Sequence, residues 1–136
     1  MLDRNLYLIG KRPKREAAAW TQAADINLAL FTGPSIVWRD AVQNKFFDSL
    51  AAGRPVANNF PGWQSRIAEE ADAGLILPAD DRAAAAHQVA AALRDKAWLE
   101  AAGRAARQLA ESRFDRDLLA AQLVGVLEQA RAEWCG

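Results

Sequence analysis

Short apolar runs separated by helix-length segments are the feature of this sequence that most constrains its fold. Four such runs, at residues 5–9, 25–31, 55–59 and 74–78, are followed by turn-forming residues such as glycine, proline and aspartate. Strands that alternate with helices favour parallel pairing through right-handed crossovers. Strands this short and apolar suit a sheet that is covered on both faces. The pattern therefore predicts an α/β fold with a parallel sheet of at least four strands flanked by helices.

The segments between the runs carry helix signals. Residues 14–24 are good helix formers that follow Pro13, a residue tolerated in a first helical turn. The helix that follows Asp40 should end at Gly53, where a left-handed glycine is expected. Ligands of such open, Rossmann-like sheets bind beyond the carboxyl ends of the strands. On this chain we expect those ends at residues 10–15, 32–40, 58–63 and 78–81.

Beyond Pro78 the pattern is helical only. Three helices are predicted over residues 81–95, 97–112 and 115–133, the first capped by Asp80 or Asp81. The last helix has one apolar stripe, formed by Leu119, Leu123, Val126, Leu127 and Ala130. We expect this stripe to pack across the domain or against a further N-terminal part of the protein.

Length, charge and cysteine content indicate what kind of protein this is. The 136 residues suit one domain, and 17 basic against 17 acidic residues give no bulk field for nucleic acid. No apolar run approaches the roughly 18 residues of a membrane-spanning helix, and the N-terminus does not have the pattern of a signal peptide. Cys135, the single cysteine, can form no internal disulfide. These features favour a soluble, cytoplasmic domain.

Two acidic residues are the main candidates for chemistry. Asp40 precedes a helix and Gln43 follows three residues later, which is an aspartate variant of the capping box. Asp40 can serve as this cap, contact a ligand, or do both, because helix N-termini also attract phosphate. Asp48 lies four residues after Asn44 on the same helix face, which is either solvated or a binding face. Lys45 lies near the helix start, where the dipole disfavours a cation unless an anion is bound.

The remaining candidates are less specific. Residues 10–15, "GKRPKR", place four cations after a predicted strand, either as a solvated turn or at a ligand edge. Trp38 and Trp63 lie in predicted loops and either pack or stack on a base or sugar. His87 has no metal-ligand spacing around it and is interpreted as structural. We find no nucleophile elbow, Walker loop, zinc spacing or GxGxxG motif.

Residues 44–56, "NKFFDSLAAGRPV", resemble a motif of the GT-B-fold glycosyltransferases, in particular family 4 and its bacterial surface-polysaccharide branch. That family carries two glutamates separated by seven residues, the second five residues before a glycine. Asp40 and Asp48 match these spacings as aspartates. Residues 7–31, 73–93 and 106–130 resemble neighbouring family segments in the same order, so the likeness spans nearly the whole chain.

The resemblance implies roles for individual residues. Asp40 would be the catalytic residue that holds hydroxyls of the transferred sugar, and Asp48 would accept hydrogen bonds from the donor ribose. Asn44 and Lys45 would face the phosphates, while the loop from Gly10 through Arg12 to Pro13 would border the base. Both carboxyl groups should converge on one hollow. The resemblance implies no metal and no cofactor, with the nucleotide-sugar donor as substrate, and the family retains anomeric configuration.

The resemblance also implies an organisation. Residues 1–136 would be the C-terminal, nucleotide-sugar-binding domain of a longer enzyme of polysaccharide or glycoconjugate synthesis, without its acceptor domain and first βα units. We expect such a chain to bind a nucleotide-diphosphate sugar but to be inactive alone. The acceptor domain would be its partner and would allow peripheral association with the inner face of the membrane.

Departures from the family pattern leave a second interpretation open. Aspartate is one methylene shorter than glutamate, and "NNFPGW" at residues 58–63 replaces the usual Gly-Gly turn. The arginine and lysine that clasp the diphosphate in the family lie on a segment that this chain lacks. The alternative is a non-catalytic Rossmann-like binding or interaction module, in which Asp40 is only a helix cap. A phosphorelay receiver is excluded, because the clustered acids at its first strand end are not found.

Overall fold

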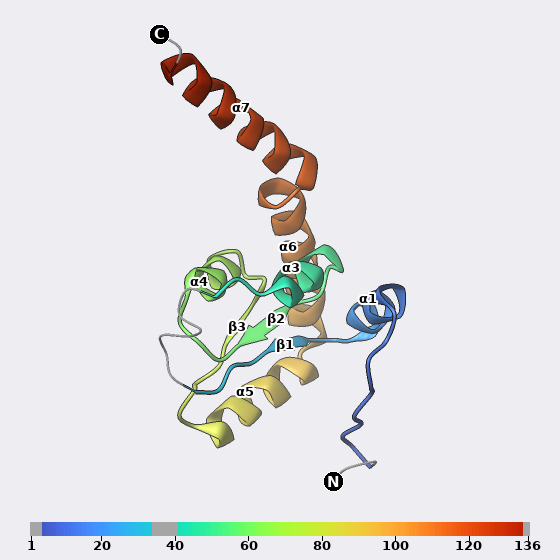
Figure 1. The fold of residues 1–136 in the computed structure, drawn as a ribbon. Helices are drawn as coiled ribbons and strands as arrows, with labels where there is room; N and C mark the ends of the chain where they lie inside the picture. Colours follow the sequence, from blue (N-terminus) through green and yellow to red (C-terminus); the bar gives the residue numbers. More distant parts are fainter. Residues whose placement is uncertain (1–3, 34–40, 135–136) are drawn as a thin grey trace.

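The computed structural model describes residues 4–33 and 41–134 of the chain. Its elements alternate between helix and strand as far as residue 76 and are helical from there on (Figure 1). They are α1 (Lys14–Ala23), β1 (Asn27–Ala29), α3 (Asn44–Ala51), β2 (Val56–Asn58), α4 (Trp63–Glu70), β3 (Gly74–Ile76), α5 (Arg82–Arg94), α6 (Lys96–Arg113) and α7 (Arg116–Trp134). The α/β class and the helical C-terminal part are confirmed.

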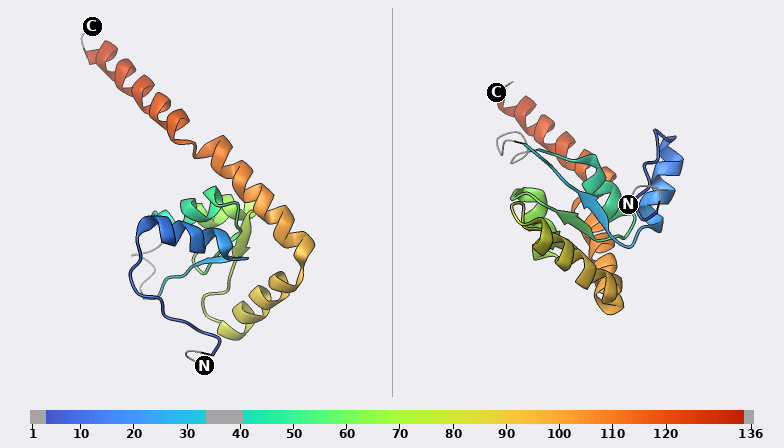
Figure 2. Two further views of the ribbon diagram at one scale, coloured as in Figure 1. Left: turned by 90° about the vertical axis from the view of Figure 1, so that its right-hand side faces the viewer. Right: turned by 90° about the horizontal axis from the view of Figure 1, so that it is seen from below.

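The three strands form a parallel sheet in the order β1-β2-β3. Residues 25–31, 55–59 and 74–78 were each expected to contain a strand, and each contains one. Helices α3 and α4 lie on one side of the sheet and α5 on the other (Figures 1 and 2). Helices thus flank the sheet on both sides, but α5 does not seal its face, since Leu28 and Leu30 remain 48% and 47% exposed. Helix α1 lies beside α3 at the β1 side of the domain.

The fourth predicted strand, at residues 5–9, is not formed, and the prediction of at least four strands is wrong for the described residues. Leu6 makes only an isolated bridge, and residues 7–10 are irregular. The side chains of Tyr7 and Leu8 are 64% and 79% exposed. An apolar run becomes a strand only when a neighbouring strand satisfies its peptide groups and other elements cover its faces. Among the described residues, no strand pairs along this run and no element covers it.

The core lies between the sheet, α3 and α6. Phe46 and Leu50 of α3 are fully buried, and Ala106 and Leu109 of α6 pack in the same cluster. Phe46 also makes edge-to-face contacts with Phe47 and Phe114, at ring-centroid distances of 5.3 and 6.4 Å. Such aromatic pairs add to the free energy of burial. This cluster fixes α3 and thereby determines which of its side chains face outward.

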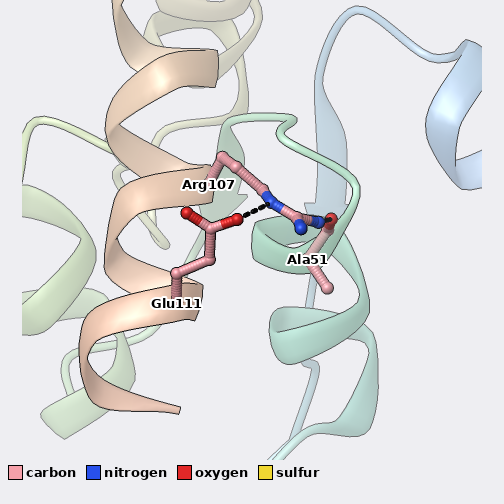
Figure 3. A network of polar contacts seen from close by, with 3 residues as sticks. All are labelled: Ala51, Arg107 and Glu111. Atoms are coloured by element: carbon pink, nitrogen blue, oxygen red, sulfur yellow. Dashed lines mark hydrogen bonds and ion pairs between the residues drawn. The ribbon is translucent and has the colours of Figure 1, made fainter. Parts of the chain in front are cut away.

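Helix α6 comes close to the turn that ends α3. A side-chain carbon on Gly103 would lie 2.7 Å from the carbonyl oxygen of Gly53, so only glycine allows this approach. Nearby, the guanidinium of Arg107 donates a 2.6 Å hydrogen bond to the carbonyl oxygen of Ala51 and a 2.7 Å bond to Glu111 (Figure 3). A cation at the C-terminal carbonyls of α3 also complements its helix dipole. The C-terminal end of α3 is therefore held firmly.

The C-terminal end of α3 is formed as predicted, but its N-terminal end is not. Gly53 adopts the expected left-handed conformation, with φ of 66°, and the amides of Gly53 and Arg54 bond back to Leu50 and Ser49 as in a Schellman motif. The start differs, because the helix begins at Asn44 and not directly after Asp40. Gln43 is the N-cap residue with extended backbone and makes no side-chain cap bond. The predicted capping box, which needs Gln43 in the first helical turn, is therefore wrong.

The physical reason for the late start is a contact with α4. The buried side-chain amide of Gln64 accepts a 3.2 Å hydrogen bond from the amide of Gln43 and donates a 3.3 Å bond to its carbonyl oxygen. This pairing imitates a strand neighbour and holds Gln43 extended. A helix cannot include a residue whose backbone is fixed in that conformation.

The C-terminal helices begin at aspartates. Asp81 accepts a 2.9 Å bond from the amide of Ala84 at the start of α5, and Asp95 accepts one from Trp98 at the start of α6. Asp115 accepts bonds from the amides of Asp117 and Leu118 at the start of α7. The prediction that Asp80 or Asp81 caps the first helix is confirmed, with Asp81 as the cap.

Removing this cap gives a direct measure of its contribution. Asp81→Ala should lower the free energy of unfolding by about 1 kcal/mol, because the amide of Ala84 loses its partner. Urea denaturation followed by circular dichroism measures the change. The neighbouring Asp80→Ala is the control and should change stability by less than about 0.5 kcal/mol. Equal losses from both variants would mean that Asp81 does not act as a cap.

Helix α7 projects away from the domain (Figures 1 and 2). No helix or strand of the described part packs along its length, and Leu119, Leu123, Val126 and Leu127 are all exposed. The stripe therefore does not pack across the described domain, and its packing against a further N-terminal part of the protein stays a prediction. None of the helices in residues 4–33 and 41–134 has the length and apolar character needed to span a lipid bilayer.

Candidate functional site

Asp48 lines a cleft between α1 and α3. The cleft has a volume of about 330 Å³, which is at the lower end of the range for small-molecule sites. Its walls are Lys14, Ala17, Ala18, Thr21 and Gln22 of α1 and Asp48, Ala51 and Ala52 of α3. One acidic and one basic side chain thus border a hollow whose remaining walls are mostly small. Such a surface can hold a flat, hydroxylated ligand and hydrogen-bond to it.

The packing of α3 explains why Asp48 points outward. Phe46, Ser49 and Leu50 face the core, and Ser49 donates a 2.6 Å hydrogen bond to the carbonyl oxygen of Lys45. With these three positions buried, helical geometry turns residue 48 to the exposed side. The main chain of Asp48 is fixed as well, since its carbonyl oxygen accepts a bond from Ala52. The carboxylate is therefore held at the cleft on a rigid element.

Helix α1, the other wall, is tied to the domain at its C-terminal end. Asn27 donates a 3.2 Å hydrogen bond to the carbonyl oxygen of Thr21, and Arg54 donates a 2.7 Å bond to that of Gln22. Both acceptors line the cleft. Two residues from the sheet side thus set the distance between the two walls.

Asn44 and Lys45 lie at the N-terminal end of α3 and are exposed. They share their turn with Asp48 but do not line the cleft. The N-cap residue Gln43 makes no side-chain cap bond, so within the described residues the first amides of α3 have no side-chain partner at the cap position. This end of the helix can receive an anion.

The two candidates from the N-terminal loop are also exposed. Arg12 forms a 3.7 Å ion pair with Glu16 of α1, and Gly10 has open space around it. Neither lines the cleft. Lys14, from the same basic cluster, does line the cleft. Its place at the first position of α1, two residues before Glu16, is the sequence signal that could have identified it. Asp40 lies outside the described residues, as does Trp38.

A second hollow, of about 520 Å³, lies at the carboxyl edge of the sheet. Residues after all three strands line it, among them Thr32, Asn59 and Pro78, with Asp80 and Arg82 from the start of α5. The hollow lies at the edge where ligands were expected to bind, and ligand binding there stays a prediction. The side-chain amide of Asn59 holds the loop after β1 through two 2.8 Å bonds to the backbone of Phe31. Of the predicted site residues that the structure describes, none lines this hollow.

Trp63 packs against the core, whereas the structural role expected of His87 stays a prediction. The ring of Trp63 packs against Phe46, Phe47 and Phe114, so it belongs to the aromatic cluster. His87 lies exposed on α5. Across residues 4–33 and 41–134, no three His, Cys, Asp or Glu side chains come together in a group able to hold a metal ion.

No protein-family model, curated protein or solved structure matches this chain. The interpretation of the α1–α3 cleft therefore depends on the residues that line it and on their places in the fold. The larger hollow at the sheet edge has the position expected for a ligand site. The α1–α3 cleft is preferred because Asp48, the acidic candidate that the structure describes, lines it, although Asp80 and Arg82 give the sheet-edge hollow an acidic and a basic side chain as well.

Proposed function

We propose that this chain is the donor-binding part of a retaining glycosyltransferase, which moves a sugar from a nucleotide-sugar to an acceptor in polysaccharide or glycoconjugate synthesis. The observation that carries the proposal is the placement of Asp48, an exposed carboxylate on a rigid helix at the wall of a cleft. A carboxylate accepts hydrogen bonds from two neighbouring hydroxyl groups, such as those of a ribose. In this proposal, Asp48 recognises the ribose of the donor.

Charges around the cleft support an anionic ligand. Lys14 lies in the first turn of α1, where the helix dipole disfavours a cation. A bound diphosphate would offset this cost. The start of α3, where Gln43 makes no side-chain cap bond, offers backbone amides and, with Lys45 beside Asn44, a second cation. Together these groups would stabilise the departing diphosphate without a metal, as oxyanion-hole donors do in acyl transfer.

Asp40 completes the proposal as the residue that would hold the transferred sugar near its reacting carbon. Its place eight residues before Asp48 follows the spacing of the resembled motif. Gly10 and Arg12 would border the base, since their loop leads directly into α1 and its wall of the cleft. The acceptor would be held by a further domain of the enzyme.

Replacing Asp48 tests the proposal directly. Isothermal titration of the 136-residue chain with UDP-, GDP-, dTDP- and ADP-sugars should give selective binding of one nucleoside diphosphate. Asp48→Ala should weaken that binding at least about tenfold, because a hydrogen bond to a charged group contributes about 1.5–3 kcal/mol. Alanine favours helix, so α3 should remain folded.

The matched control for this experiment is Glu70→Ala, which removes an exposed carboxylate from α4, away from the cleft. It should leave the affinity unchanged. Asp48→Asn, which keeps the shape but not the charge, should fall between the wild type and Asp48→Ala. Binding that is equally tight in all variants, or equal for all four nucleotides, would count against the proposal.

A non-catalytic binding or interaction module is the second candidate. The exposed apolar side chains of α7 favour it, since a surface of this kind marks a place where proteins associate. This alternative predicts no preference among nucleotides in the same titration. It also predicts that Asp48→Ala has no effect on any binding activity of the chain.

A further inference from the structure

The sheet-edge hollow adjoins an apolar groove between β1 and α5, which we call the α5 groove. The two spaces share Leu30, Leu77 and Ala85 among their lining residues. The α5 groove has a volume of about 430 Å³, and its other walls are Leu28, Ala86, Val89, Ala90 and Leu93. A ligand at the carboxyl edge of the sheet can therefore extend an apolar part into the α5 groove.

Two opposite charges line the sheet-edge hollow. Arg82 is the first residue of α5, and Asp80 lies two residues before it. Within residues 4–33 and 41–134, neither side chain forms an ion pair or a side-chain hydrogen bond. Both charges are thus available to a ligand that carries one acidic and one basic group.

The start of α5 favours a carboxylate over a phosphate as the acidic group. Asp81, the N-cap residue, accepts a hydrogen bond from the amide of Ala84 and so occupies the helix end where a phosphate would bind. A second carboxylate, that of Asp80, would also repel a doubly charged anion. The planar guanidinium of Arg82 matches the two oxygens of a carboxylate.

The apolar walls of the sheet-edge hollow are fixed by their own contacts. Asn59 bonds twice to the backbone of Phe31, whose ring meets that of Phe60 edge to face at a centroid distance of 5.2 Å. Leu77 is buried, and its amide donates a 2.7 Å hydrogen bond to the carbonyl oxygen of Asn58. Preformed apolar walls with a few polar groups are typical of small-molecule sites.

We propose that the sheet-edge hollow and the α5 groove together bind a free α-amino acid with a large apolar side chain. Asp80 accepts hydrogen bonds from the ammonium group, Arg82 donates hydrogen bonds to the carboxylate, and the side chain of the ligand lies in the α5 groove. The inference is independent of the nucleotide-binding proposal, since no residue of the α1–α3 cleft lines either space.

Nuclear magnetic resonance titration of the isotope-labelled chain with L-leucine tests the site. The amide signals of Phe31, Leu77 and Ala85 should shift, whereas those of Ala18 and Ala52 in the α1–α3 cleft should not. Glycine should bind at least about tenfold more weakly than leucine, because it has no side chain to bury in the α5 groove. No saturable binding of leucine, or equal affinities for leucine and glycine, would overturn the proposal.

Two analogues separate the roles of the charges. Leucinamide keeps the ammonium group without the carboxylate, and N-acetyl-leucine keeps the carboxylate without the ammonium group. Asp80→Asn should weaken binding of leucine and leucinamide about fivefold and leave N-acetyl-leucine unchanged. Arg82→Gln should weaken leucine and N-acetyl-leucine to the same extent and leave leucinamide unchanged.

The matched control for these variants is Arg94→Gln, which removes an exposed charge from the other end of α5, outside both spaces. It should change none of the three affinities. If Asp80→Asn and Arg82→Gln affected all three ligands alike, the assignment of the two charges would be contradicted.

Ala86→Glu tests the apolar part of the site. Ala86 is exposed on α5 and lines the α5 groove, so circular dichroism and thermal unfolding should show an intact fold. Binding of leucine should weaken at least about fivefold, because the new carboxylate lies against the apolar side chain of the ligand. His87→Glu adds the same charge outside the groove and should leave the affinity unchanged. Equal losses from the two variants would place the ligand elsewhere.

Discussion

Replacing Gly74 with alanine should lower the free energy of unfolding by about 3 kcal/mol or more, the largest effect we expect from adding a single methyl group to this chain. The new side-chain carbon would collide with the backbone carbonyl oxygen of Val56 on the adjacent strand. Gly74 and Val56 are register partners in the sheet, so neither can move without breaking the β2–β3 ladder. Chemical denaturation of Gly74→Ala against the wild type measures the loss.

Gly125→Ala is the matched control for this substitution. A side-chain carbon on Gly125 has open space around it, and the residue lies within α7. Alanine favours helix over glycine by about 1 kcal/mol, so this variant should be as stable as the wild type or more so. If the two glycine variants behaved alike, the close approach of β2 and β3 at Gly74 would be refuted.

Truncation of Phe46 should have the second large effect. Phe46→Ala should cost about 3–5 kcal/mol, because the ring is fully buried and contacts Phe47, Trp63 and Phe114. The loss should appear in both thermal and urea unfolding. It should also loosen α3, so near-UV circular dichroism of the aromatic cluster should fall.

Tyr7→Ala is the corresponding control, since this aromatic residue is 64% exposed and lies in the irregular N-terminal segment. Its removal should change stability by less than about 0.5 kcal/mol. A comparable loss from Tyr7→Ala would show that the segment at residues 5–9 is packed in solution, contrary to the structure.

Much of the fold was predictable because its signals are local. The strands β1, β2 and β3 lie within the apolar runs that were expected to form them, and Gly53 and Asp81 mark helix ends by chemistry that needs no distant partner. Residues 5–9 carry the same local signal, yet no strand forms there. The difference is tertiary, because a strand requires a neighbour that the sequence pattern of that strand does not specify.

The start of α3 was also mispredicted because a contact distant in sequence determines it. Helix-forming residues before Asn44 predicted an earlier beginning, and the side chain of Gln64, twenty-one residues away, holds Gln43 extended instead. The residues around Gln43 in the sequence do not predict this contact. Trp63 likewise was open to a stacking role, and only the aromatic neighbours from α3 and the end of α6 identify it as a packing residue.

For the site, the outward position of Asp48 followed from the sequence, because Phe46 and Leu50 on the same helix had to face the core. The opposite wall of the cleft was not predictable, since α1 is brought to α3 by contacts that are distant in sequence. Lys14 was therefore seen only as one cation of a cluster. Convergence of Asp40 with Asp48 remains a prediction, because Asp40 lies outside the described residues.

The simple order β1-β2-β3 has a consequence for biosynthesis. As the chain leaves the ribosome, β2 meets a partner that has already been made, and β3 then meets β2. Each described strand can therefore pair as soon as it emerges, without waiting for a segment still to be translated. Helix α6, which covers α3, comes later and would seal a sheet that is already assembled.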